Sequence, residues 1–128
     1  MTNPAGPSPD APRARVLIIE DEPLVAENLR ADLIDSGFEV VGVAPKLEKA
    51  LRLIGEAACD IAIVDANLAG VSAAPAAAAL TARHLPFVVL SGYTRSQLSN
   101  EFQAAVFVQK PYRIGRLLAE VRTLLAER

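Results

Sequence analysis

The chain is short of the residues that form disulfide bonds and zinc sites. Its 128 residues include one cysteine, one histidine and no tryptophan. A single cysteine cannot form a disulfide bond within the chain, which suits a reducing compartment. We expect Cys59 to be a small buried side chain, because the only histidine, His84, is a poor candidate base at a predicted helix end. The same scarcity excludes a zinc site of the usual Cys/His type.

Long hydrophobic runs and an excess of positive charge are also missing. No stretch approaches the roughly 18 uninterrupted apolar residues of a membrane span, and the N-terminus lacks the hydrophobic segment of a signal peptide. We therefore expect a cytoplasmic protein without membrane contact. The formal net charge of -2 argues against direct binding of nucleic acid, because phosphate backbones require clustered lysine and arginine.

The remaining composition fits one folded domain preceded by a tail. A chain of 128 residues can bury a core without disulfide bonds or structural metals. Residues 1–13 contain four prolines among glycine, serine and asparagine, and are predicted to form a disordered N-terminal tail. Residues 14–128 are predicted to form the domain.

Strand-like and helix-like patterns alternate along this domain. Aliphatic runs predict five buried strands, at residues 15–20, 38–43, 60–64, 86–90 and 106–109. Amphipathic patterns predict helices at residues 23–35, 47–54, 72–84 and 114–125, with Ser72 as the cap of the third. The alternation predicts an α/β fold with a doubly wound, five-stranded parallel sheet. Residues 94–103 have few apolar anchors, so we expect any helix there to be short or irregular.

Polar residues of complementary chemistry follow four of the predicted strands. Glu20 ends the first and Asp21 follows it, and Asp65 follows the third, Ser91 the fourth and Lys110 the fifth. In an open parallel sheet, ligands bind in the crevice outside the carboxyl ends of the strands. Carboxylates gathered there suit a hard cation such as Mg²⁺, which also binds phosphate oxygens. The set therefore predicts a site for Mg²⁺ and a phosphoryl group.

Each residue has a predicted role at such a site. Asp65 is the natural nucleophile, because a carboxylate can form an acyl phosphate. Lys110 supplies positive charge and Ser91 a hydroxyl donor to the phosphoryl oxygens. Taken singly, Asp21 and Asp65 could instead cap the helices that follow, and Ser91 and Lys110 could be ordinary turn and surface residues. Taken together, these separate roles are a much weaker explanation than a shared site, because four strand ends would have to supply complementary groups by accident.

With these motifs, the chain resembles the receiver domain of two-component response regulators, a phosphoacceptor module of flavodoxin-like (βα)5 fold. The likeness covers residues 14–126. The motifs, in chain order, are Val16-Leu17-Ile18-Ile19-Glu20-Asp21-Glu22, Ile63-Val64-Asp65-Ala66-Asn67, Ser91, Phe107 and Lys110-Pro111. Five separated motifs in the same order make the likeness specific.

The resemblance implies a role for each residue of these motifs. Asp65 is the phosphorylation site, and Lys110 contacts the phosphoryl group. Glu20, Asp21, Asp65 and the main-chain carbonyl of Asn67 hold Mg²⁺. Ser91 and Phe107 are the hydroxyl and the aromatic ring of the conformational switch. Such a domain is not an enzyme, although it assists its own phosphorylation and dephosphorylation.

A narrower resemblance lies in residues 86–93, Pro-Phe-Val-Val-Leu-Ser-Gly-Tyr. This stretch is similar to the Pro-Phe-x-Phe-Ala-Thr-Gly-Tyr motif of the stand-alone "FAT GUY" receivers. Proline, phenylalanine, glycine and tyrosine match, whereas Val89, Leu90 and Ser91 replace phenylalanine, alanine and threonine. The likeness implies a histidine kinase partner of the HWE class.

Three positions depart from the common pattern or modulate the chemistry. Glu20 replaces the commoner aspartate and lengthens that acid by a methylene, which affects metal coordination. Asn67 and Tyr93 lie two residues beyond Asp65 and Ser91, where receivers have the path of hydrolytic water. The bulk of Tyr93 is suited to shielding an acyl phosphate, although it could equally be a packing residue.

We therefore predict a stand-alone receiver in a two-component phosphorelay. It would accept a phosphoryl group on Asp65 from a histidine kinase or phosphotransfer protein and relay the signal by altered binding to a downstream protein. One alternative is a receiver cut from a longer DNA-binding response regulator. A phosphatase of the haloacid-dehalogenase type is disfavoured, because it needs a second aspartate where Asn67 stands. A purely structural interaction module would not need Lys110 and the acidic pair at one crevice.

Overall fold

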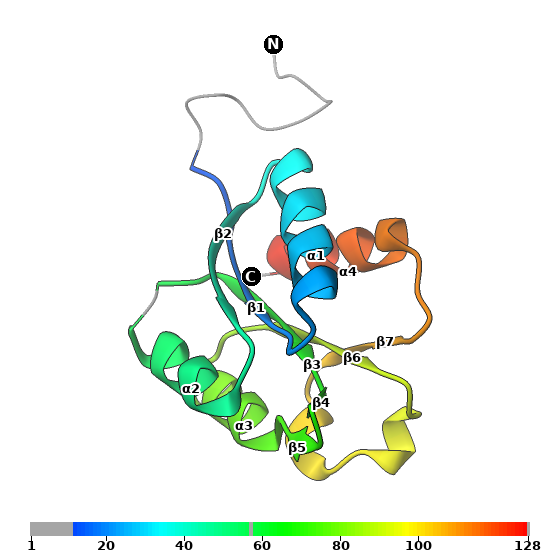
Figure 1. The fold of residues 1–128 in the computed structure, drawn as a ribbon. Helices are drawn as coiled ribbons and strands as arrows, with labels where there is room; N and C mark the ends of the chain where they lie inside the picture. The colour runs from blue at the N-terminus through cyan, green and yellow to red at the C-terminus, as the bar shows by residue number, and fades with distance from the viewer. Residues whose placement is uncertain (1–11, 57, 128) are drawn as a thin grey trace.

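A central parallel sheet organises the molecule, and the computed structural model describes residues 12–56 and 58–127 of it (Figure 1). The sheet has five strands in the order β2-β1-β3-β6-β7. Their bounds are β1 Arg15–Ile19, β2 Glu39–Ala44, β3 Ile61–Asp65, β6 Phe87–Ser91 and β7 Val106–Gln109. All pairs in this sheet are parallel. The doubly wound α/β fold predicted from the sequence is confirmed.

Helices cover both faces of the sheet. The helices are α1 Pro23–Asp35, α2 Leu47–Glu56, α3 Ala74–Ala82 and α4 Ile114–Ala126. Figure 1 shows α1 and α4 on one face and α2 and α3 on the other. The central strands β3 and β6 are buried along their whole length, because helices cover them from both sides.

Successive side chains of β1 belong alternately to two separate parts of the core. Leu17 and Ile19 pack with the apolar residues of α2 and α3. Val16 and Ile18 pack with those of α1 and α4. Successive side chains of a strand point to opposite faces, so one strand supplies both layers.

The β6–β7 connection contains no α-helix. It forms two single turns of 3₁₀-helix, η1 Arg95–Gln97 and η2 Asn100–Phe102. Only Phe102 is fully buried among them, and it packs against the α2–α3 side of the core. The expectation of a short or irregular fourth helix is confirmed. The physical reason is the shortage of apolar anchors, because a helix gains most of its stability from a packed face.

The predicted cap of the third helix is wrong. That helix begins at Ala74, with Ala73 in the capping position. Ser72 instead belongs to a small hairpin formed by β4 Asn67–Leu68 and β5 Val71–Ser72, although its hydroxyl accepts a hydrogen bond from the Ala74 N–H at 3.1 Å. The hairpin turn has Ala69 and Gly70 at positive φ, so the chain reverses there before the helix can start.

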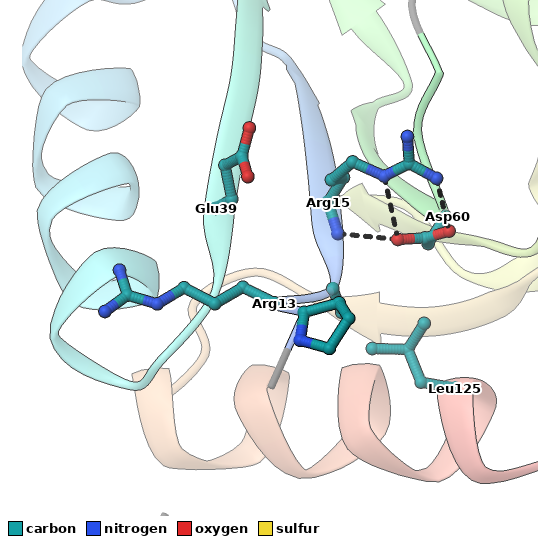
Figure 2. A pocket seen from close by; sticks show the side chains of 7 residues that line it. Arg13, Arg15, Glu39, Asp60 and Leu125 are labelled. Carbon is teal, nitrogen blue, oxygen red and sulfur yellow. Dashed lines mark hydrogen bonds and ion pairs between the residues drawn. The ribbon is translucent and has the colours of Figure 1, made fainter. Parts of the chain in front are cut away.

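The amino ends of the strands carry a paired charge cluster (Figure 2). The Arg15 guanidinium donates to both carboxylate oxygens of Asp60, at 3.3 and 3.1 Å, and the main-chain N–H groups of both residues are also bonded across the pair. A cavity of about 780 Å³ opens beside them. The pair ties β1 to the start of β3 and lies at the end of the sheet opposite the predicted site.

Two further sequence expectations concern the N-terminal tail and the absence of a membrane span. Of the predicted tail, residues 1–11 lie outside them. Within residues 12–56 and 58–127, no helix has the length and hydropathy needed to cross a membrane.

Candidate functional site

Three carboxylates meet at the carboxyl ends of β1 and β3. Glu20 and Asp21 directly follow β1, and Asp65 is the last residue of the neighbouring β3. One carboxylate oxygen of each residue lies within 4.8 Å of the others. The predicted acidic cluster is thus brought together by the pairing of two strands that are far apart in the sequence.

Glu20 is the buried member of this cluster, with 2% of its surface exposed. Its Oε2 accepts a hydrogen bond from the Glu22 N–H at 3.1 Å. Its Oε1 is buried, and no donor within the described residues reaches it. Burial, helped by the nearby charge of Asp65, raises the pKa of Glu20 to about 7. A buried carboxylate oxygen without a donor, facing two further carboxylates, fits a bound cation.

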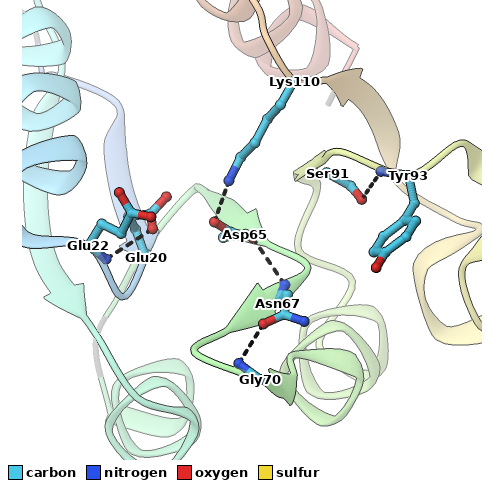
Figure 3. Close-up of polar contacts among 8 residues, drawn as sticks. All are labelled: Glu20, Glu22, Asp65, Asn67, Gly70, Ser91, Tyr93 and Lys110. Atoms are coloured by element: carbon cyan, nitrogen blue, oxygen red, sulfur yellow. Dashed lines mark hydrogen bonds and ion pairs between the residues drawn. The ribbon is translucent and has the colours of Figure 1, made fainter.

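Asp65 lies at the centre of the site and is bonded through both oxygens (Figure 3). Its Oδ2 accepts a hydrogen bond from Lys110 Nζ at 2.6 Å, and its Oδ1 accepts one from the Asn67 N–H at 3.0 Å. Lys110 is held in turn by its own N–H, which donates to the Ser91 carbonyl at 2.8 Å. Burial lowers the pKa of Lys110, but its hydrogen bond to the Asp65 carboxylate and the negative charge of that carboxylate outweigh burial and raise the lysine pKa.

The hydroxyl of Ser91 borders the same crevice. Ser91 is the last residue of β6 and is 3% exposed, and its Oγ accepts a hydrogen bond from the Tyr93 N–H at 2.9 Å. Tyr93 itself is 56% exposed and lies on the rim of the crevice (Figure 3). The side chain of Asn67 points to its own turn, where Oδ1 accepts a hydrogen bond from the Gly70 N–H at 2.7 Å. The crevice has a volume of about 300 Å³, and its lining includes Asp21, Asp65, Asn67, Ser91, Tyr93 and Lys110.

Phe107 lies outside this crevice, on the edge strand β7. It pairs in register with Val89 of β6 and packs, half-buried, against the α2–α3 side of the core. The guanidinium of Arg95 lies over its ring, 5.0 Å from the centroid. No sequence pattern singled out Arg95, because the contact depends on how the β6–β7 connection folds back onto the strand.

Cys59 and His84 take no part in the site. Cys59 is buried, as predicted, and burial raises the pKa of its thiol. His84 is exposed at the end of α3, with positive φ. Both lie near the amino ends of strands, at the opposite end of the sheet from the cluster of Glu20, Asp21 and Asp65.

The fold, the carboxylate cluster and the lysine define a class of protein, and comparison with known families identifies it. The family model of the response regulator receiver domain matches residues 16–122. The chain belongs to this family. Receiver domains bind Mg²⁺ at an acidic pocket and interact with histidine kinases or phosphotransfer proteins within two-component systems.

Individual relatives agree with this assignment. The transcriptional regulatory protein PdtaR of Mycobacterium tuberculosis is 30% identical over 123 residues, which are 91% of this chain and 60% of PdtaR. The chain therefore spans about 60% of the length of this curated relative.

Solved structures show the same fold. The solution structure of SdrG from Sphingomonas melonis Fr1 has a TM-score of 0.74 and 32% identity, over 88% of this chain and 97% of SdrG. The BeF3-activated conformation of SdrG, from Pseudomonas melonis Fr1, has a TM-score of 0.71 and 33% identity, over 87% of this chain and 95% of that one. A CheY-like receiver from Methanospirillum hungatei JF-1 has a TM-score of 0.81 at 21% identity, over 91% and 96% of the two chains.

Proposed function

We propose that Asp65 accepts a phosphoryl group from a phosphohistidine of a histidine kinase or phosphotransfer protein, in a Mg²⁺-dependent reaction. The observation that carries this proposal is the position of the Asp65 carboxylate. It lies within 4.8 Å of two further carboxylates on one side and 2.6 Å from Lys110 Nζ on the other. Glu20, Asp21, Asp65 and the main-chain carbonyl of Asn67 would hold the cation.

Apart from the nucleophilic attack by Asp65, the transfer requires little covalent chemistry from the protein. An Asp65 oxygen attacks phosphorus, the new P–O bond forms as the P–N bond to the histidine breaks, and the imidazole leaves and is reprotonated from solvent. Positioning and electrostatic stabilisation dominate such reactions. Bound Mg²⁺ would supply positive charge close to the phosphoryl oxygens. Lys110 supplies a second positive charge. Its present ion pair with Asp65 would be replaced by an ion pair with the phosphoryl group.

Ser91 and Phe107 are proposed to convert this modification into a conformational change. The Ser91 Oγ already accepts a hydrogen bond from the Tyr93 N–H, so its own proton is free for a phosphoryl oxygen. Movement of Ser91 toward that oxygen frees space on the face of β6 against which Phe107 packs. The ring of Phe107 then changes position on the edge strand, where a partner can reach it.

The signal would leave by altered binding to a downstream protein, as expected of a stand-alone receiver of the "FAT GUY" subgroup with a kinase of the HWE class. The likeness to SdrG, which has a BeF3-activated conformation, supports a phosphoryl-driven change in this chain. The proposed role is that of a signalling domain and not of a catalyst acting on a substrate in turnover.

A second candidate is a receiver joined to a DNA-binding output domain. The chain spans 60% of PdtaR and 52% of the DNA-binding response regulator MtrA of Mycolicibacterium smegmatis. An immunoblot of the protein in its native cells distinguishes the two. A band near the 13.6 kDa of this chain supports the stand-alone receiver, and a band of about twice that mass supports the longer regulator.

Phosphotransfer from labelled ATP through candidate histidine kinases tests the assignment of Asp65. Asn is isosteric with Asp but is not a competent nucleophile, so Asp65→Asn should remain unlabelled. Asp35→Asn is the matched control, because Asp35 is an exposed aspartate at the far end of α1. Labelling of Asp65→Asn at the level of the wild-type protein would refute the assignment.

A further inference from the structure

Arg95 occupies an unusual position in the segment that replaces a helix between β6 and β7. Neither single 3₁₀ turn can stabilise itself, so contacts between side chains and main chain hold the connection. Arg95 Nη1 donates to the Gln103 carbonyl at 3.1 Å. Gln103 Nε2 donates to the carbonyls of Arg95, Leu98 and Ser99, at 2.9, 3.1 and 3.4 Å. The two residues thus close the connection reciprocally.

The same guanidinium also lies over the ring of Phe107, 5.0 Å from its centroid. Arg95 therefore joins the closed connection to the edge strand through its guanidinium. A guanidinium over an aromatic face is held by the ring quadrupole and by stacking. If the ring changes position, Arg95 loses this contact.

The conformation with this contact is the one that belongs to the unmodified carboxylate. In it Lys110 pairs directly with Asp65 at 2.6 Å, an arrangement that a phosphoryl group on Asp65 would replace. The contact between Arg95 and Phe107 therefore adds stability to the unphosphorylated conformation. Phosphorylation has to overcome that stability before the ring can move.

We infer that Arg95 is a positioning residue that restrains Phe107 and the β6–β7 connection until Asp65 is phosphorylated. The inference rests on the proposed function, because it assumes a phosphoryl-driven movement of the ring. It adds a named restraint whose strength sets how readily the domain is activated. A ligand binds more weakly when a smaller fraction of the molecules is in the binding-competent conformation. Weakening the restraint raises that fraction and should therefore tighten the binding of a phosphoryl mimic.

Beryllofluoride with Mg²⁺ is the probe, titrated against the whole chain by backbone amide NMR. Arg95→Ala should bind it about two- to fivefold more tightly than the wild-type protein, the factor expected from losing an exposed cation–π contact. Without the probe, the amide signals of Phe107 and residues 94–103 should shift toward their positions in the bound wild-type protein. Arg95→Lys keeps the charge without the planar stacking group and should fall between the two.

Two further variants separate the restraint from a general effect. Arg122→Ala removes a similar contact, with the guanidinium 5.9 Å from the Phe38 ring at the other end of the sheet, and should leave beryllofluoride affinity unchanged. Gln103→Ala breaks the other half of the closure and should tighten binding non-additively with Arg95→Ala, as expected for one coupled unit.

The outcomes are distinct. Unchanged or weaker binding by Arg95→Ala, or an equal effect of Arg122→Ala, overturns the inference while the wild-type response upholds the proposed function. No response of the wild-type protein to beryllofluoride and Mg²⁺ overturns the proposed function, and the inference with it.

Discussion

Replacing Glu20 by glutamine should stabilise the metal-free protein, and the gain should depend on pH. The physical reason is that folding places this carboxylate in a buried position, where its pKa rises from 4.5 to about 7. Between these two values the folded protein holds a proton on Glu20 that the unfolded chain has released. The free energy of unfolding therefore falls as pH rises through this window and reaches its lower plateau above it.

The magnitude follows from the size of the pKa shift. At about 1.4 kcal/mol per pKa unit, the full cost of ionising Glu20 in the folded protein is about 3 kcal/mol. Glutamine keeps an oxygen for the Glu22 N–H and carries no charge. In EDTA at pH 8, Glu20→Gln should therefore be more stable than the wild-type protein by up to about 3 kcal/mol, and the difference should vanish near pH 4.5.

Urea unfolding across this pH range, with EDTA or with Mg²⁺, measures the effect. Mg²⁺ should raise the stability of the wild-type protein at pH 8 and have less effect on Glu20→Gln, because a cation bound to the folded state shifts the unfolding equilibrium. The control is Glu27→Gln, an exposed glutamate on α1 whose ion pair with Arg30 contributes only a few tenths of a kcal/mol. A stability difference between Glu20→Gln and wild type that stays constant from pH 5 to pH 8 would refute the reasoning.

Three other variants test separate parts of the molecule. Asp21→Ala should abolish both Mg²⁺ binding, measured by calorimetry, and phosphorylation; retained Mg²⁺ binding would show that Asp21 is not a required ligand, and no Mg²⁺ binding by the wild-type protein would leave the acidic cluster a capping role only. Phe102→Ala should lower the free energy of unfolding by about 3–5 kcal/mol, because a fully buried ring anchors the connection; a loss below about 1 kcal/mol in urea unfolding would show that the ring is not needed. Tyr93→Ala should shorten the lifetime of the acyl phosphate several-fold in a dephosphorylation assay, since the ring shields the crevice, and an unchanged lifetime would make Tyr93 a packing residue only.

The five strands could be predicted because their aliphatic runs match burial on both faces of a sheet. The convergence of the candidate site residues could be predicted for a related reason. Parallel strands end at one edge, so Glu20, Asp65, Ser91 and Lys110 had to converge there once the strands were assigned. The ion pair between Asp65 and Lys110 is a direct consequence of that convergence.

The start of the third helix and the contact of Arg95 could not be predicted in this way. Ser72 has the right chemistry for a cap, but the hairpin of β4 and β5 displaces the helix start by using the same residues. The stacking of Arg95 on Phe107 joins residues twelve positions apart through an irregular connection, for which there is no periodicity to follow. Both depend on tertiary structure that local propensity does not encode.

The division of the core by β1 makes two adjacent side chains independent reporters of conformational change. Ile19 lies in the same layer of the core as Phe107. The neighbouring Ile18 lies on the opposite face of the sheet, in the same layer as Tyr112, which follows Lys110 by two residues. In methyl-labelled protein, a movement that begins at the Phe107 ring should perturb the Ile19 signal first. A movement that begins at the turn after Lys110 should perturb Ile18. The backbone thus places, one residue apart, two spectroscopic probes for the two sides of the sheet.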